Sequence, residues 1–131
     1  MDELRIGAGD DVVRVRQQVR AAAAGAGMSL IDQTKLVTAA SELARNTLIH
    51  GGGGAATIDK VTSPAGRAGI RVAFSDEGPG IPDRDLALTD GWTTGNGLGL
   101  GLSGARRLVD EFELMANAAG GTRVVVTKWS R

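Results

Sequence analysis

A run of alternating glycines, GNGLGLGLSG at residues 95–104, constrains the fold of this chain more than any other feature. Glycine has no Cβ, so it tolerates positive φ and lets a ligand lie close to backbone amides. Residues 105–109 follow with apolar side chains at helical spacing. A glycine-rich turn that leads into a helix offers free N–H groups and a positive dipole end, which together favour an anion such as phosphate.

Two common phosphate-binding loops share this pattern, and neither fits its surroundings. Gly99, Gly101 and Gly104 spell the dinucleotide fingerprint, but no strand directly precedes them and no acidic residue follows about 20 positions later. A P-loop requires a lysine beside the glycines, and there is none. Two interpretations of the glycine run therefore stay open: another kind of phosphate-binding loop, or a simple hinge. Gly104 is expected to allow close packing of the helix that follows.

Composition narrows the class of protein. The chain has 131 residues, and its 15 basic and 15 acidic residues cancel, so no overall charge attracts nucleic acid or anionic lipid. With no cysteine and one histidine, a zinc site of the usual kind is improbable. We therefore expect a single domain over residues 1–131 that does not bind nucleic acid. Because no signal peptide or apolar span is evident, we also expect it to be cytoplasmic and not bound to a membrane.

Hydrophobic periodicity predicts the secondary structure. Some segments alternate apolar and polar residues, as strands do, and others repeat apolar residues at helical spacing. Ser29 is expected to cap the second helix, with Asp32 three residues on. The order predicts an α+β two-layer sandwich: one mixed, mostly antiparallel sheet with three main helices on one face. The predicted elements are strand 4–7, helices 11–24 and 29–50, strands 56–61 and 70–74 with a turn at 63–67, an irregular connection 75–97, a third helix ending near 109, and strands 112–116 and 123–129.

The second helix carries a candidate reactive pair. Glu42 and Asn46 are four residues apart and therefore share one side of the helix. An Asn amide oxygen can join phosphates around Mg²⁺, and a Glu carboxylate can accept a proton from a hydroxyl. A solvated polar surface would give the same pattern. His50, one turn further, is expected to act as a helix-end cap rather than as a catalyst.

A second motif, DEGPGI at residues 76–81, follows an apolar strand. Asp76 at the strand end can accept a hydrogen bond from an adenine amino group, while the glycines let the ring pass close to the backbone. The alternative is an ordinary turn, because Asp, Gly and Pro all favour turns.

Taken in this order, the three blocks resemble the Bergerat nucleotide-binding fold shared by gyrase, Hsp90, histidine kinases and MutL. Glu42 and Asn46 match its N box, residues 76–80 its first glycine box and residues 97–101 its second. The pair at 121–122 matches the Gly-Thr that the family places before its last strand. The protein-kinase fold is excluded, since its strand lysine and His-Arg-Asp motif are absent.

Within that superfamily the chain resembles the RsbT-type serine/threonine kinases of the anti-sigma regulatory branch, most particularly at residues 41–46, 76–82, 107–112 and 128–129. The resemblance implies that Glu42 is the general base, that Asn46 binds Mg²⁺, and that residues 83–96 form a lid over ATP. It assigns the nucleotide contacts to Asn46, Asp76, Gly78, Gly80, Ile81, Thr93, Thr94, Gly97, Leu98, Gly99, Leu100, Gly101 and Thr122.

The resemblance also implies partners. The acceptors would be STAS-domain proteins of a stressosome, similar to RsbS and RsbR, and the released kinase would activate a PP2C-type phosphatase similar to RsbU. The alternative from the same branch is an anti-sigma factor that sequesters a sigma subunit in a nucleotide-dependent way. A histidine-kinase fragment is disfavoured, because the sole histidine, His50, lies inside the N box.

Overall fold

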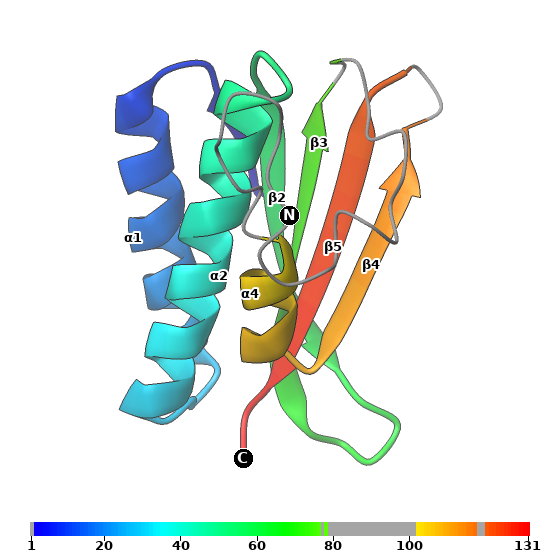
Figure 1. Cartoon of the computed structure of the whole chain (residues 1–131). Coiled ribbons are helices and arrows are strands. Elements are labelled where there is room, and N and C mark those ends of the chain that lie inside the picture. The colour runs from blue at the N-terminus through cyan, green and yellow to red at the C-terminus, as the bar shows by residue number, and fades with distance from the viewer. Residues whose placement is uncertain (1, 77, 79–101, 118–119) are drawn as a thin grey trace.

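The computed structural model describes residues 2–76, 78, 102–117 and 120–131. Five strands and three helices occur in this part of the chain, in the order predicted from the sequence (Figure 1). No helix in it is long and apolar enough to cross a membrane. The elements are β1 (Asp2–Ile6), α1 (Gly9–Gly25), α2 (Leu30–Ile49), β2 (Gly54–Thr62), β3 (Ala68–Asp76), α4 (Leu102–Leu108), β4 (Glu111–Ala116) and β5 (Thr122–Trp129).

The strands form one sheet in the order β1-β2-β3-β5-β4. Every pairing in it is antiparallel. All three helices lie against the same face of this sheet, and in the described residues no helix covers the opposite face (Figure 1). The predicted α+β two-layer sandwich is thereby confirmed, and the predicted turn at 63–67 joins β2 to β3, with Ser63 N donating to Arg67 O at 2.8 Å.

Both long helices begin where side chains satisfy free backbone groups. Ser29 Oγ accepts a hydrogen bond from Asp32 N at 3.1 Å, as the sequence predicts. At α1 the Asp11 carboxylate accepts from Gly7 N at 2.8 Å and Ala8 N at 3.0 Å. These bonds occupy N–H groups that a helix start would otherwise leave without partners.

The core lies between the helices and the sheet. Side chains alternate along a strand, so every second residue of β3 points toward the helices. Phe74 is 1 % exposed, and in the sheet its neighbours are Ala56 of β2 and Val124 of β5. The buried hydrophobic side chains of this core cluster are Ile6, Val15, Val19, Ala23, Met28, Leu36, Val37, Ala39, Ala40, Leu43, Ala44, Ala56, Ile70, Val72, Phe74, Leu102, Ala105, Val124 and Val126.

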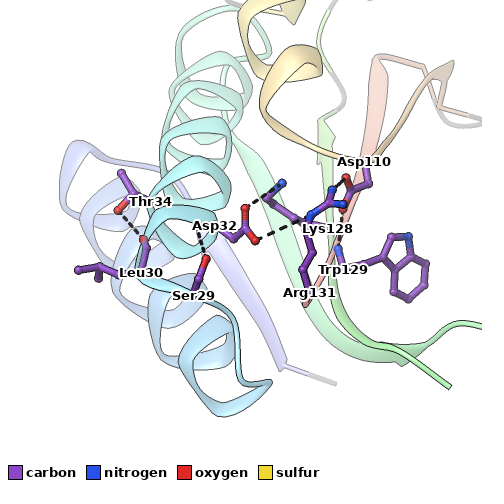
Figure 2. Close-up of polar contacts among 8 residues, drawn as sticks. All are labelled: Ser29, Leu30, Asp32, Thr34, Asp110, Lys128, Trp129 and Arg131. Carbon is purple, nitrogen blue, oxygen red and sulfur yellow. Dashed lines mark hydrogen bonds and ion pairs between the residues drawn. The ribbon is translucent and has the colours of Figure 1, made fainter.

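A polar network fastens the first turn of α2 to the end of β5 (Figure 2). The carboxylate of Asp32 lies 3.6 Å from Nζ of Lys128 and 3.9 Å from Nε of Arg131. Arg131 also pairs with Asp110, which in turn accepts a hydrogen bond from Trp129 N at 2.8 Å. Lys128 is 4 % exposed, so this ion pair is largely removed from water. We refer to these five residues as the far-end network.

Candidate functional site

A pocket opens at the other end of the same elements, where α2 ends, β3 ends and β5 begins. Its described wall combines apolar side chains of the core with polar groups at its mouth. Such a mixture is typical of pockets that hold a flat, partly polar ring. The lining residues are Leu43, Asn46, Thr47, His50, Gly51, Phe74, Asp76, Leu102, Thr122 and Val124.

Asp76 is the acidic group of this pocket. Its Oδ1 accepts hydrogen bonds from Gly78 N at 2.9 Å and from Thr122 N at 3.2 Å. No group in the described residues donates to its other carboxylate oxygen. An ionised carboxylate accepts several hydrogen bonds, so Oδ2 retains capacity for an N–H of a ligand in the pocket.

Glycines pack around Asp76 where a side chain would collide. A Cβ added at Gly51 would lie 2.4 Å from Cγ of Asp76, and one added at Gly121 would lie 2.2 Å from the Asp76 carbonyl oxygen. A Cβ at Gly78 would meet Gly51 Cα at 2.7 Å. The backbone at Gly51 and Gly121 therefore approaches Asp76, and the backbone at Gly78 approaches Gly51, more closely than any other residue type would permit.

Asn117, which the sequence analysis did not single out, connects the β4–β5 turn to the end of β3. Its Nδ2 donates to the Asp76 carbonyl oxygen at 3.0 Å, and its backbone N donates to Gly121 O at 3.2 Å. The turn is thereby held where Thr122 N reaches Oδ1. In the sequence Asn117 only indicates a turn, because Asn is common in turns of every kind.

Helix α2 supplies the opposite wall. Asn46 and His50 both line the pocket, and His50 N donates to Asn46 O at 2.9 Å, so His50 forms the predicted helix-end cap. Leu43 and Thr47 also reach the pocket. The same helical period that places Asn46 on the wall could have identified both as lining residues from the sequence.

Glu42 lies outside this wall. Its side chain is 41 % exposed, and its carboxylate is 3.8 Å from Nη1 of Arg45. Glu42 and Asn46 share a side of α2 as their spacing predicts, but only Asn46 lines the pocket. The structure therefore brings together Asn46, Asp76, Gly78 and Thr122, and Glu42 is not among the residues that line the pocket.

The remaining predicted contacts fall on residues that the structure does not describe: Gly80, Ile81, Thr93, Thr94, Gly97, Leu98, Gly99, Leu100, Gly101 and the lid at 83–96. The expectation that Gly104 packs closely is not met by the described residues, none of which would lie within 4 Å of an added Cβ. In the described part of the chain, no cluster of three His, Cys, Asp or Glu side chains could hold a metal ion by itself.

Comparison with known proteins gives matches over most of the chain. Residues 31–130 match the family of histidine kinase-, DNA gyrase B- and HSP90-like ATPases. The chain is 42 % identical over 121 residues to the serine/threonine-protein kinase RsbT of Bacillus subtilis (strain 168), covering 92 % of this chain and 90 % of that protein. It is 32 % identical over 100 residues to an anti-sigma F factor of Bacillus cereus (strain G9842), covering 73 % and 68 % respectively.

Two solved structures share the fold. The RsbU and RsbW domains of a Mycobacterium tuberculosis protein align with all of this chain at a TM-score of 0.64 and 25 % identity, over 33 % of that larger chain. The catalytic domain of the histidine kinase ThkA aligns with 99 % of this chain and 97 % of its own at a TM-score of 0.61 and 16 % identity. The second likeness concerns the fold alone.

Proposed function

This chain belongs to the family of histidine kinase-, DNA gyrase B- and HSP90-like ATPases, and from that premise we propose that it is an ATP-dependent protein serine/threonine kinase. One observation carries the proposal: Oδ1 of Asp76 accepts hydrogen bonds from two backbone amides, while Oδ2, beside an apolar pocket, has no donor among the described residues. The amino group of adenine is a donor suited to Oδ2. Guanine has a carbonyl oxygen at the equivalent ring position, which a carboxylate would repel, so ATP is preferred over GTP.

Asn46 fits the role of a magnesium ligand. It is the amide-bearing residue on the α2 wall, and the described residues hold no carboxylate cluster that would bind the ion without the nucleotide. A magnesium ion that keeps few protein ligands and takes several phosphate oxygens suits such a site. Bound there, it would neutralise phosphate charge. The glycines at 97–101, with Thr93 and Thr94, are proposed to contact the phosphates.

Phosphoryl transfer requires a group that removes the proton of the acceptor hydroxyl, and we assign this role to Glu42. As the hydroxyl oxygen bonds to the γ-phosphorus, its proton passes to the Glu42 carboxylate. The bond from the γ-phosphorus to the β–γ bridging oxygen breaks, and ADP leaves with that oxygen. Glu42 is exposed, so the hydroxyl of a protein can reach it from solution.

The relatives guide the choice of partners. The similarity to RsbT, and to a structure that contains RsbU and RsbW domains, supports a switch in which a kinase exchanges partners. We propose STAS-domain proteins as acceptors, and a PP2C-type phosphatase as the protein that the released kinase activates.

The test is phosphotransfer in a purified mixture of this chain, ATP, Mg²⁺ and STAS-domain proteins from the same genome. We expect a phosphoserine or phosphothreonine on one STAS protein, detected by mass spectrometry, and none when ATP is replaced by GTP at equal concentration. Absence of transfer to every STAS protein tried, with ATP binding intact, would refute the kinase.

An anti-sigma factor is the second candidate, supported by the 32 % identity to anti-sigma F factor over 100 residues. It makes the opposite prediction in a binding assay. The immobilised chain, loaded with ATP or ADP, would retain a sigma subunit and release it with the nucleotide, and it would not retain STAS proteins. The kinase is expected to retain STAS proteins and no sigma subunit.

A further inference from the structure

Large hydrophobic side chains that remain exposed are confined to one layer of the described structure. The large hydrophobic residues that remain exposed are Val13, Leu30, Ile31 and Ile49, and all four belong to α1 or α2. The uncovered face of the sheet has none among its described residues. Ile31 is 69 % exposed and Ile49 51 %. Large aliphatic groups that gather on one surface are characteristic of protein interaction sites.

On α2, Ile31 and Ile49 belong to a single line along the helix, and Leu30 is the residue next to Ile31 in the chain. Spacings of alternately four and three residues keep side chains on one side of a helix with 3.6 residues per turn. From the first to the last member this line is about 27 Å long at the helical rise of 1.5 Å. Its members, which we call the α2 ridge, are all exposed or half-buried: Ile31, Lys35, Thr38, Glu42, Arg45 and Ile49.

The helical layer also differs in charge from the uncovered face of the sheet. The outward side chains of α1 and α2 comprise five basic residues (Arg14, Arg16, Arg20, Lys35, Arg45) and three acidic ones (Asp10, Asp11, Glu42), since Asp32 is buried against Lys128. On the uncovered sheet face the acidic residues outnumber the basic ones: the strand registers place Glu3, Asp59, Glu111 and Glu113 there with Arg5, Arg71 and Arg123. The helical layer is therefore the more basic and the more apolar of the two.

We propose that the α2 ridge is the docking surface for the protein acceptor, and that this acceptor presents acidic side chains next to aliphatic ones. The inference deepens the proposed kinase function and rests on it. Glu42 carries the argument, because the candidate base lies on the ridge and outside the pocket wall. An acceptor bound along the ridge would bring its hydroxyl to Glu42 while ATP fills the pocket behind.

Charge complementarity supports an acidic occupant. Lys35 has no ion-pair partner in the described residues, and Arg45 has only the exposed 3.8 Å contact with Glu42. A carboxylate of the acceptor that bound Arg45 would compete with Glu42 for it and free the Glu42 carboxylate for proton transfer. Complementary charges of this kind mainly set which partner binds and how fast it associates.

The test uses the full chain with the double substitution Ile31→Ser/Lys35→Glu, two ridge positions remote from the nucleotide pocket. The matched control is Lys60→Glu, which reverses the charge of an exposed lysine on β2. We measure the KM of a STAS-domain acceptor, its Kd in the presence of ATP and Mg²⁺, and the Kd of ATP alone. For the double variant we expect KM and Kd of the acceptor to rise about tenfold, equivalent to about 1.4 kcal/mol.

In the double variant, kcat at saturating acceptor and the affinity for ATP should both stay within about twofold of wild type. Lys60→Glu should stay within about twofold of wild type in every measurement. Transfer by wild type with an unchanged acceptor KM in the double variant would overturn the docking surface and leave the kinase standing. If the acceptor binds without being phosphorylated, and only the ridge variant weakens this binding, the docking surface would stand and the kinase would be refuted. Loss of self-association in the ridge variant, seen by sedimentation, would assign the ridge to a second copy and overturn the proposal.

Discussion

Two aspartates near opposite ends of the sandwich have opposite surroundings. Asp32 lies against Lys128 and Arg131, so both of its oxygens face cations. Asp76 is held through one oxygen by backbone amides, and its second oxygen has no donor among the described residues. The first arrangement satisfies both carboxylate oxygens within the protein, whereas the second leaves Oδ2 without a donor among the described residues.

Helix α2 and strand β5 contribute to stability at one end and to the candidate site at the other. At the far-end network, α2 and β5 are joined by charges that are expensive to bury singly and tolerable only as a pair. At the pocket, the same elements end in glycines and backbone amides that position Asp76 without occupying it fully. Substitutions at the far end should therefore change folding and leave nucleotide affinity intact, and those at the pocket should do the converse.

The largest expected effect is on stability. Lys128→Met removes the buried partner of Asp32 and should lower the free energy of unfolding by about 3 kcal/mol, because one charge remains buried without its main counterion. Chemical denaturation measures it. The double variant Asp32→Leu/Lys128→Met should recover most of the loss, and ATP affinity of the folded protein should stay within about twofold throughout. Equal stability of Lys128→Met and wild type would show that the pair has no structural role.

Asp76→Asn should weaken ATP binding about 100-fold, or about 2.7 kcal/mol, because the amide loses the charge-assisted acceptor and can place an NH₂ against the adenine amino group. Calorimetric titration with ATP measures the change. Asp59→Asn on the uncovered sheet face serves as the control. If Asp76→Asn binds ATP as wild type does, this carboxylate does not recognise the base.

Asn117→Asp should cost about tenfold in ATP affinity, or about 1.4 kcal/mol, since it keeps the shape of the side chain and replaces the donor to the Asp76 carbonyl oxygen by an acceptor. The melting temperature should change little, because Asn117 lies at a turn. An ATP affinity unchanged from wild type would mean that Thr122 N reaches Asp76 without help from this turn.

The smallest effect concerns pH. Hydrogen bonding from Gly7 N, above all, lowers the pKa of Asp11 below its ordinary value of 3.8, with further contributions from Ala8 N, Arg14 and Arg5 against an opposing effect of desolvation. A lowered pKa means that Asp11 stabilises the fold above pH about 4 and loses this effect as the pH falls through its folded pKa. Thermal melts from pH 5 to pH 3 should therefore show a steeper fall for wild type than for Asp11→Asn; parallel curves would contradict this.

Much of this arrangement follows from local pattern. The element order was predictable because hydrophobic periods of two and 3.6 residues identify strands and helices. Ser29 indicated the start of α2, and Asp76 at the end of an apolar strand indicated a pocket. Strand ends were the least predictable: the first strand was expected at 4–7 and occupies Asp2–Ile6, since pairing with β2 decides where it stops.

Long-range contacts were beyond local pattern. Lys128 is 96 residues from Asp32, and a lysine in a β-branched strand predicts only a solvent-facing position, so the buried pair depends on how α2 crosses the sheet. Asn117 meets Asp76 only because β5 lies next to β3. The spacing of Glu42 and Asn46 placed both on one side of α2 but could not show that the pocket wall ends between them.

The central claim is that Asp76 binds the nucleotide and that Glu42 accepts the proton of the acceptor hydroxyl during phosphoryl transfer. The most direct measurement compares Glu42→Gln with wild type in the same preparation, for ATP affinity and for the single-turnover rate of transfer to the STAS acceptor. We expect ATP affinity within about twofold and a transfer rate lowered at least about 100-fold, the range for loss of a general base. A Glu42→Gln variant that transfers phosphate at the wild-type rate, or that loses ATP binding as Asp76→Asn does, would contradict the account.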